Sequence, residues 1–483
     1  MERLRDTVIK GAFWSTIERF GYLGIQFLAN LIMARILSPT DFGIIGILLI
    51  FISLANVLAD SGLASALVQR KNISSVDCNT IFLTNLFIGI ALYVLLFLST
   101  PWISTFFNHE NLSSYLRAIG VVIILDAISS IQNALLIKNL DFKTIAILRI
   151  LSIIGACTIS IYLAFKNWGI WALVIQYIIY SFLRSILLYY FSSWRPKFEY
   201  SFKSFSSLFN YGAKLMLSTF IADIYLNFQS LLIGKFLNPK ILGFYTQAKQ
   251  LQQVPVTALT SIINQVSFPA FAKIQEDKSR FIHAFKNNII ILSFINFPLM
   301  FLLSALATPL ITFLYTDKWI DAAPYFQFLC IGFGTLLVIH NTNLTALKAL
   351  GKSGVVLKLE ILKKLLGIVL LILGIWLYGI WGIMLALTIN SIIEIFLNGY
   401  YINKYIEITP FQQLKWLSPF LIFSTISFFI TLFLIRLLSW SNIILIFLGI
   451  ILFISSYGIM VYTFAPHIFQ NILLPLLKKV KLS

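Results

Sequence analysis

One stretch of this sequence occurs twice, as Leu31-Ile-Met-Ala-Arg-Ile-Leu-Ser-Pro-Thr-Asp-Phe-Gly43 and, 200 positions later, as Leu231-Leu-Ile-Gly-Lys-Phe-Leu-Asn-Pro-Lys-Ile-Leu-Gly243. Both copies close one apolar run and open the next, with a proline and a glycine in the same places. A second echo pairs Gly169-Ile-Trp171 with Gly379-Ile-Trp381. Because a membrane chain made of two similar halves usually holds its substrate path between them, the repeat favours a transporter.

The composition is that of a protein embedded in a membrane. Of its 483 residues, 59% are hydrophobic and 11% are charged, and the mean hydropathy is +0.90. A membrane-spanning helix needs about 20 mostly apolar residues. The alternating polarity of a barrel strand is absent, so the spans are expected to be helices. The sequence therefore predicts an all-α integral membrane protein with about 14 transmembrane helices. The predicted spans are 11–34, 43–67, 80–104, 115–137, 144–165, 169–191, 209–235, 243–271, 285–313, 324–347, 357–377, 380–403, 416–437 and 442–464.

The basic residues predict the orientation of the chain. There are 36 Lys and Arg residues against 18 Asp and Glu, a net charge of +18, which by itself could indicate a nucleic-acid partner. Most of the basic residues, however, lie at the two termini and in the even-numbered connections between predicted spans. Placing both termini in the cytoplasm turns this distribution into the positive-inside bias of membrane proteins. The excess also attracts anionic lipid headgroups, and we expect no nucleic-acid partner.

Catalytic and metal-binding patterns are missing from the sequence. Cys78, Cys157 and Cys330 lie far apart, without the paired spacing of a disulfide framework or a metal site. No zinc-protease, nucleophile-elbow or phosphate-loop motif occurs. We therefore expect a protein that is not an enzyme and that holds neither a metal nor a bound cofactor.

Polar side chains inside the predicted spans mark the candidate transport site. A charge near the bilayer centre costs at least ~2.5–3.5 kcal/mol on insertion scales, so such residues normally face the bundle interior or a water-filled cavity. Here they recur on the first, second, seventh and eighth predicted spans, which are equivalent places in the two halves. These residues are Glu18, Arg19, Gln26 and Asn30; Asn56 and Asp60; Lys214, Asp223 and Asn227; and Lys249, Gln250, Gln253, Thr257 and Asn264.

The types of these residues suggest the chemistry of the cargo. Intramembrane cations suit an anionic group, above all phosphate, which Arg can bind bidentately and Lys as a point charge. The cations in question are Arg19, Lys214 and Lys249. Uncharged amides and hydroxyls suit a hydroxyl-rich cargo such as a sugar, whose polar groups need partners once water is removed. Residues expected to contact sugar are Gln26, Asn30, Gln250, Gln253, Thr257 and Asn264. The acids Glu18, Asp60 and Asp223 are candidates for coupling transport to H⁺ or Na⁺.

Each of these assignments has a purely structural alternative. Glu18 and Arg19 could pair with Lys214 or Asp223 and only hold the halves together. Asp60 could cap or bend the inner end of the second span. Lys249 could extend its side chain to the membrane interface.

Several motifs resemble those of a known family. Gly11-Ala-Phe-Trp-Ser15, followed by Ala34-Arg-Ile-Leu-Ser-Pro-Thr-Asp-Phe-Gly43, is similar to the opening of bacterial polysaccharide exporters of the colanic-acid/teichuronic-acid type. Leu58-Ala-Asp-Ser-Gly-Leu-Ala-Ser-Ala-Leu-Val-Gln69 and Leu242-Gly-Phe-Tyr-Thr-Gln-Ala-Lys-Gln-Leu-Gln-Gln-Val-Pro255 resemble later phrases of the same family. The resemblance extends from about residue 10 to residue 464. These exporters belong to the multidrug/oligosaccharidyl-lipid/polysaccharide (MOP) exporter superfamily.

This resemblance implies an architecture and a cargo. The architecture is two pseudo-symmetric six-helix lobes, at 1–200 and 201–408, followed by two extra helices and a basic tail at 409–483. The cargo is an oligosaccharide linked to undecaprenyl diphosphate, which Arg19, Lys214 and Lys249 would bind through the diphosphate. Alternating access would move it across the bacterial inner membrane for assembly of O-antigen, capsule or exopolysaccharide. A polysaccharide polymerase or chain-length system is the expected partner, and one chain holding both lobes is expected to work as a monomer.

Three other functions compete with this hypothesis. A cation-coupled multidrug exporter shares the fold, but its cationic cargo suits a cavity bearing Lys and Arg poorly. A lipid II flippase is compatible with the charges, although the motifs do not resemble it. A membrane-embedded polymerase or glycosyltransferase generally has a large outer loop or paired acids on one, and this sequence has neither.

Overall fold

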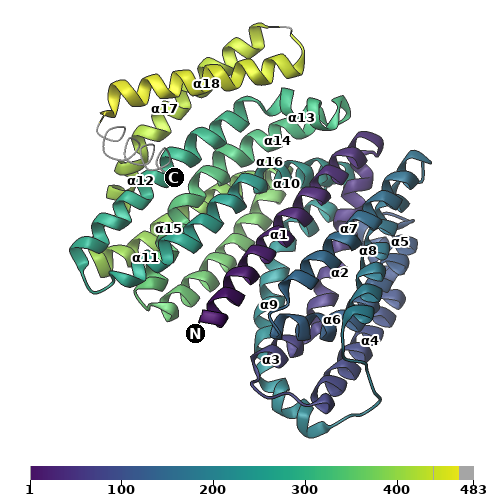
Figure 1. The fold of residues 1–483 in the computed structure, drawn as a ribbon. Helices are drawn as coiled ribbons and strands as arrows, with labels where there is room; N and C mark the ends of the chain where they lie inside the picture. The colour runs from purple at the N-terminus through teal and green to yellow at the C-terminus, as the bar shows by residue number, and fades with distance from the viewer. Residues whose placement is uncertain (1, 439, 467–483) are drawn as a thin grey trace. The chain divides into compact units, whose positions relative to one another are not determined.

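The computed structural model describes residues 2–438 and 440–466, and every regular element within them is helical (Figure 1). This confirms the predicted all-α class. Eleven helical segments of the described residues are long and apolar enough to cross a membrane. The longest of them, α16 (Ser353–Ile406), has non-helical backbone at Tyr378 and Gly379, where two of the predicted spans meet. With α1 and α10, whose polar stripes lower their mean hydropathy, the helices are consistent with the expected fourteen spans.

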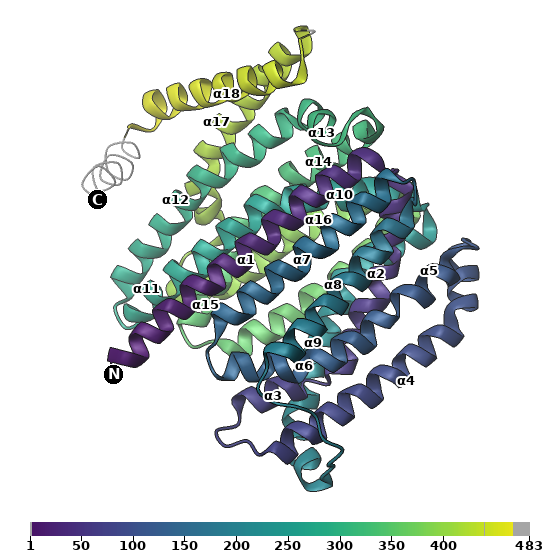
Figure 2. The same cartoon turned by 45° about the vertical axis from the view of Figure 1, so that its right-hand side comes forward.

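The chain divides into two units, residues 1–243 and 244–483. The helices of unit 1 are α1 (Glu2–Ile36), α2 (Pro39–Asp60), α3 (Leu63–Gln69), α4 (Ser75–Phe107), α5 (Leu112–Ile119), α6 (Val121–Lys138), α7 (Phe142–Phe165), α8 (Ile170–Phe191) and α9 (Phe202–Phe236). Within this unit α1 runs along α7, and α7 runs along α8 (Figure 2). Helix α9, which the predicted boundary at residue 200 assigns to the second lobe, packs against α2, α3 and α4. The boundary itself stays a prediction.

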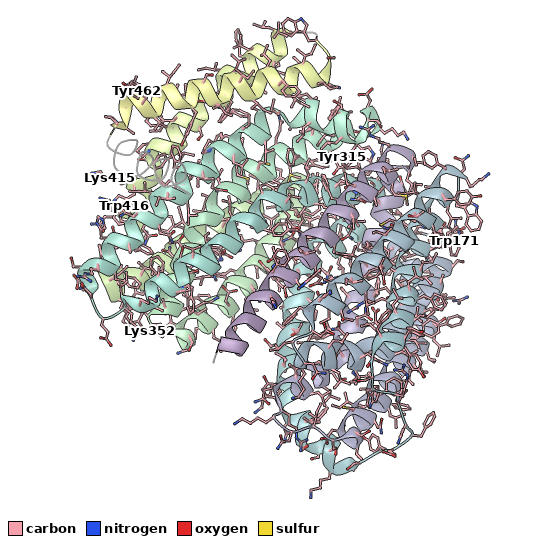
Figure 3. All side chains as sticks on the ribbon, in the orientation of Figure 1. Trp171, Tyr315, Lys352, Lys415, Trp416 and Tyr462 are labelled. Atoms are coloured by element: carbon pink, nitrogen blue, oxygen red, sulfur yellow. The ribbon has the colours of Figure 1, made fainter. Side chains whose placement is uncertain are left out.

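Unit 2 contains the second half of the repeat and the two C-terminal helices. Helix α10 (Pro239–Ile262) begins in unit 1 and continues into unit 2. It is followed by a π-helix (Ile263–Ser267), α11 (Phe268–Lys273), α12 (Lys278–Ala305), α13 (Ala307–Tyr315), a 3₁₀ helix (Asp317–Ala322), α14 (Ala323–Phe328), a second π-helix (Leu329–Gly334), α15 (Thr335–Ala349), α16, α17 (Pro410–Leu437) and α18 (Asn442–Phe464). Lys352 and Lys415 lie toward one end of this unit and Tyr315 toward the other (Figure 3). Lys352 and Lys415 belong to even-numbered connections between predicted spans, and the cytoplasmic location of these connections stays a prediction.

The two halves share backbone details that go beyond the sequence echo. Gly169 has φ 57° and ψ −135°, and Gly379 has φ 58° and ψ −131°. An L-residue adopts this conformation only under strain, whereas glycine adopts it readily. The tryptophan two residues later meets a tyrosine edge to face in both units. The ring centroids are 5.1 Å apart for Tyr115 and Trp171, and 5.5 Å for Tyr325 and Trp381. Residues 210 positions apart are therefore structural equivalents in this part of the repeat.

The contacts within unit 1 explain why the repeated stretches 31–43 and 231–243 both end in glycine. A β-carbon on Gly43 would lie 1.6 Å from the carbonyl oxygen of Pro239, and one on Gly243 would lie 1.8 Å from that of Pro39. The N-terminal turns of α2 and α10 therefore pack against each other reciprocally, backbone on backbone. Only glycine permits so close an approach, and this explains why both copies of the motif end in glycine.

Candidate functional site

The polar face of α1 begins with an ion pair inside unit 1. Glu18 accepts a hydrogen bond from the guanidinium of Arg149 on α7, and that guanidinium also lies 4.2 Å from the ring centroid of Tyr22. Tyr22 in turn contacts Tyr180 of α8, with 5.8 Å between ring centroids. Glu18 thus pairs with Arg149, and not with Lys214 or Asp223 as the structural alternative supposed. A charge that is neutralised in this way can stay inside the helix bundle.

A polar cavity of about 310 Å³ lies between α2, α3, α6 and α8 of unit 1. Its wall includes three charged residues, Asp60, Asp126 and Arg184. The carboxylate of Asp126 accepts a hydrogen bond from Asn56 Nδ2 at 2.9 Å and another from the hydroxyl of Ser181. The predicted acid Asp60 therefore lines a cavity, as a residue of a hydrated site would.

A second cavity, of about 250 Å³, adjoins the first. It is bordered by Glu18 and Arg149, and it shares Asn133, Ile137 and Arg184 with the larger cavity. The interior of unit 1 therefore contains five charged side chains around a continuous polar region. Sequence reasoning missed Asp126 because it stands alone in an apolar run. A usable signal existed, however, since Asp126, Ser129, Ser130 and Asn133 recur at the spacing of one helical face.

The other predicted residues of unit 1 lie on α1 and α9. Arg19 and Lys214 are exposed, and Gln26 and Asn30 are half-buried on α1. Asp223 is half-buried on α9, and its Oδ2 is a buried atom without a hydrogen-bond partner among the described residues. These positions are compatible with contacts to a bound molecule, and their assignment to phosphate and sugar stays a prediction.

The predicted residues on α10 belong to unit 2. Lys249 and Gln250 are half-buried, and the Lys249 ammonium lies 5.7 Å from the ring centroid of Tyr245. Gln253 and Thr257 are exposed, and the Thr257 hydroxyl donates to the carbonyl of Val254 at 3.0 Å. The side chain of Asn264 lies outside the described part of the structure. Because the three predicted phosphate ligands are divided between the two units, their convergence on one group also stays a prediction.

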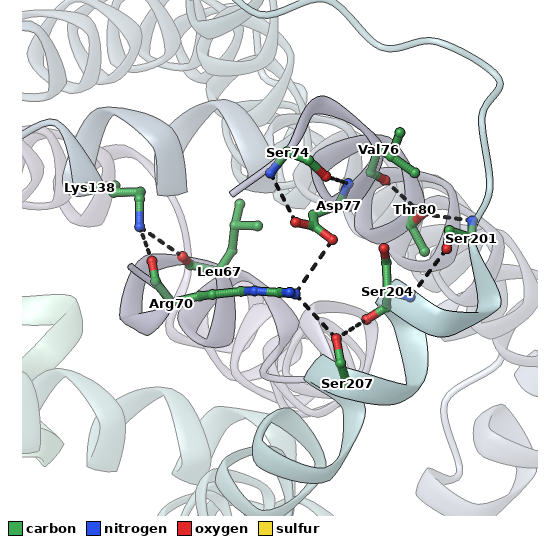
Figure 4. A network of polar contacts seen from close by, with 10 residues as sticks. All are labelled: Leu67, Arg70, Ser74, Val76, Asp77, Thr80, Lys138, Ser201, Ser204 and Ser207. Carbon is green, nitrogen blue, oxygen red and sulfur yellow. Dashed lines mark hydrogen bonds and ion pairs between the residues drawn. The ribbon is translucent and has the colours of Figure 1, made fainter. Parts of the chain in front are cut away.

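A polar network holds α9 against the first half at one end of unit 1 (Figure 4). The Arg70 guanidinium lies 3.5 Å from the Asp77 carboxylate and donates to Ser207 Oγ at 3.2 Å. The backbone N–H of Ser201, which caps α9, donates to Thr80 Oγ1 at 3.0 Å. The helix that carries Lys214 and Asp223 is therefore anchored to α3 and α4.

Comparisons with known proteins agree with this fold. Residues 32–324 match a family described as polysaccharide biosynthesis protein. The lipopolysaccharide biosynthesis protein WzxC of Escherichia coli (strain K12) is 27% identical over 413 residues, which cover 85% of this chain and 84% of the relative. The succinoglycan biosynthesis transport protein ExoT of Rhizobium meliloti (strain 1021) is 28% identical over 353 residues, covering 72% and 70%.

Solved structures share the fold at lower sequence identity. The lipid II flippase MurJ in an inward closed conformation gives a TM-score of 0.70 at 18% identity, covering 93% of this chain and 99% of its own. An inward-facing multidrug transporter of the MATE family gives 0.58 at 11% identity, covering 82% and 98%. These likenesses confirm the predicted fold of an all-α integral membrane protein.

Proposed function

The chain belongs to the polysaccharide biosynthesis protein family, and from this premise we propose that it is a flippase for lipid-linked oligosaccharides. Its cargo is an oligosaccharide repeat unit on undecaprenyl diphosphate, turned from the inner to the outer leaflet of the bacterial inner membrane for surface polysaccharide assembly. The match over residues 32–324, with relatives named for lipopolysaccharide biosynthesis and succinoglycan transport, carries this proposal. The protein is a transporter and not an enzyme.

The mechanism is alternating access between the two halves of the repeat. Arg19, Lys214 and Lys249 attract the diphosphate, and the amides and hydroxyls on α1 and α10 receive the sugar hydroxyls. The exposure of Arg19 and Lys214 supports these roles, since a cation that binds cargo must be reachable. The lipid tail stays in the bilayer. Both termini face the cytoplasm, and a single chain suffices, working alongside a polysaccharide polymerase.

A cation gradient of H⁺ or Na⁺ drives the cycle. Asp60 suits this role, because its carboxylate borders the 310 Å³ cavity of unit 1. Asp223, with a buried carboxylate oxygen that lacks a described partner, is a second candidate. Glu18 is neutralised by Arg149 and fits the role less well.

The test is flipping of a labelled glycan on undecaprenyl diphosphate by purified protein in liposomes. Access of an external lectin to the glycan reports the leaflet. Arg19→Ala and Lys214→Ala should each slow flipping about tenfold or more, because a hydrogen bond to a charged group contributes roughly 1.5–3 kcal/mol. Lys10→Ala, which removes another exposed cation from α1, is the control and should flip at the wild-type rate.

Two results would contradict the proposal at different levels. Wild-type rates in both variants would remove the phosphate assignment while leaving the flippase in place. A wild-type protein that moves no glycan lipid but extrudes organic cations would replace the flippase with a multidrug exporter, which the shared MATE-type fold makes the second candidate.

A further inference from the structure

Unit 2 contains a buried histidine–carboxylate pair that the proposed mechanism does not use. His340 Nδ1 on α15 lies 2.8 Å from Glu394 Oε2 on the second part of α16, and the two side chains are each 17% exposed. Asn390 Nδ2 donates to Glu394 Oε1 at 2.9 Å. Asn398 Nδ2 lies 3.2 Å from His340 Nδ1. Both helices belong to candidate membrane spans, so this pair sits inside the transmembrane region.

The 2.8 Å contact holds one hydrogen between nitrogen and oxygen, and either atom can carry it. With that hydrogen on Nδ1, the pair is a neutral imidazole beside a carboxylate and has a net charge of −1. Uptake of one more proton at Nε2 forms an imidazolium–carboxylate pair with no net charge. Histidine is the side chain whose protonation changes most readily near neutral pH. The geometry therefore provides two charge states that differ by one proton.

The surroundings leave this proton exchangeable. The charged groups whose fields reach Glu394 are His340 and Lys363, and the Lys363 ammonium is itself bonded to Glu360. From α11, α12 and α17, no charged group of the described residues lies within ion-pair distance of His340 or Glu394. No fixed cation is therefore bonded directly to the carboxylate, and the histidine is its ion-pair partner.

Several buried amide atoms on α15 and α16 have no hydrogen-bond partner among the described residues. Asn343, one turn beyond His340 on α15, is fully buried, and neither of its side-chain polar atoms has a hydrogen-bond partner among the described residues. The Oδ1 atoms of Asn390 and Asn398 are also buried without such a partner. Buried polar groups of this kind normally bind ordered water. Water at these atoms would give protons a route to the pair.

The backbone next to the pair is also unusual. A π-helix, Leu329–Gly334, leads directly into α15, and Asn296 Nδ2 donates to the carbonyls of Gly334 and Thr335 at 3.0 Å and 3.1 Å. π-Helical turns inside α-helices occur frequently at functional sites. The helix that carries His340 therefore starts from an irregular segment, and carbonyls at this junction accept hydrogen bonds from Asn296.

The equivalent positions in unit 1 carry different chemistry. Counting back 210 positions places Ser130 at His340, Asn133 at Asn343 and Arg184 at Glu394. Ser130 accepts a hydrogen bond from Asn85, and Arg184 borders the polar cavity. The corresponding helices of unit 1, α6 and α8, therefore pack together without an ion pair at these positions. The histidine and the carboxylate are instead particular to unit 2.

We propose that His340 and Glu394, in place of the candidates Asp60 and Asp223 of unit 1, form the proton-binding site that couples transport to the proton gradient. This inference rests on the proposed flippase function and names its driving ion. In each cycle one proton binds at His340 Nε2 from one side of the membrane, and the N–H bond breaks again to release it on the other side. The bound proton removes the net charge of the pair, so the protonated and deprotonated states favour different arrangements of α15 and α16.

The first test uses liposomes with a labelled glycan on undecaprenyl diphosphate and an imposed pH difference. A difference of about one pH unit should change the steady-state distribution of the glycan lipid about tenfold for each proton coupled. Glu394→Gln and His340→Asn should lose this dependence. Glu407→Gln, the same chemical change at an exposed site near the end of the same helix, should keep it.

Three other outcomes of the liposome test would each contradict a different part of the proposal. Variants that keep the pH dependence overturn the assignment to this pair. Wild-type flipping that responds to a sodium gradient and not to pH overturns the proton while leaving the flippase intact. If the wild type moves no glycan lipid, the proposed flippase function is wrong. Proton binding by His340 and Glu394 is then tested by the second experiment alone.

The second test needs no cargo. The protein has four histidines, so NMR of histidine-labelled protein gives four imidazole signals, and His340→Asn identifies one of them by its loss. In Glu394→Gln the pH dependence of that signal should change, because the carboxylate 2.8 Å from Nδ1 is removed. A signal that does not titrate in the wild type, or that titrates identically in Glu394→Gln, would overturn the proposal.

Discussion

The two halves of the repeat share backbone conformation but differ in their interior polar residues. In unit 1 the position of Arg184 borders an open polar cavity of about 310 Å³, while in unit 2 the equivalent Glu394 is bonded directly to His340. Glycines with matching positive φ begin both helices. The scaffold thus tolerates opposite charges at the same place. The two halves therefore have the same backbone conformation at these helix starts, while the polar residues on the helices differ in type and charge.

The largest expected effect concerns the contact at which the two copies of the motif meet. Gly43→Ala and Gly243→Ala each place a β-carbon within 2 Å of a carbonyl oxygen, and backbone atoms cannot yield as a flexible side chain would. Both should lower the free energy of unfolding by about 3 kcal/mol, the upper range for overpacking. Thermal unfolding in detergent measures this, with Gly24→Ala, which meets nothing within 4 Å, as the control. Clearly different losses of stability in the two variants would show that the contact between α2 and α10 is not reciprocal.

The next effect concerns the glycines that begin α8 and the second part of α16. Gly169→Ala and Gly379→Ala force an L-residue into a strained conformation, which costs about 2 kcal/mol. The two losses should agree within experimental error, because the φ and ψ angles of the two glycines nearly coincide. If only one of these two substitutions lowered the stability, the two glycines would not be under the same backbone constraint.

Polar coupling should differ between the halves. A double-mutant cycle on Asp126 and Ser181 in unit 1 should give about 0.6 kcal/mol, the average for hydrogen bonds between membrane helices. The same cycle on His340 and Glu394 should give about 2 kcal/mol, because an imidazolium and a carboxylate carry opposite charges, whereas the Ser181 hydroxyl is neutral. Denaturation of the four variants of each cycle supplies the numbers. Equal coupling energies would remove the contrast between the two interiors.

The smallest effect is expected at the exposed ion pairs. Arg70→Ala in unit 1 and Lys278→Ala in unit 2 each break a pair in which at least one side chain is well exposed. Such pairs contribute roughly 0–1 kcal/mol. Thermal unfolding should therefore change little in either variant. A loss comparable to that of the glycine variants would mean that the network in Figure 4 holds α9 more firmly than its geometry suggests.

The sequence predicted the helices well because apolar length and basic loops are strong signals. The echoes at Gly43 and Gly169 identified two positions whose backbone constraints the structure explains. The interior chemistry was less visible. Asp126 and His340 lie on helices that carry several other polar residues, and their partners Asn56, Ser181 and Glu394 lie on other helices. Hydrogen bonds between helices depend on how the helices pack, and a single sequence does not reveal which polar residues of two helices meet.

The residues assigned to the cargo were chosen by a different argument. Arg19 and Lys214 were chosen because a charge inside a span needs a reason. The structure places both at exposed positions, where a bound molecule can reach them. Only a measurement with cargo tests these two assignments, whereas Glu18 was resolved by its contact with Arg149.

The most direct test of the account follows glycan lipid and protons together in the same liposomes. A labelled glycan on undecaprenyl diphosphate reports the leaflet, and a pH-sensitive dye inside the liposome reports protons. We expect that adding the glycan lipid starts a proton flux in a fixed ratio to the number of glycans flipped. A membrane across which no labelled glycan moves, although the protein is folded and inserted, would contradict it.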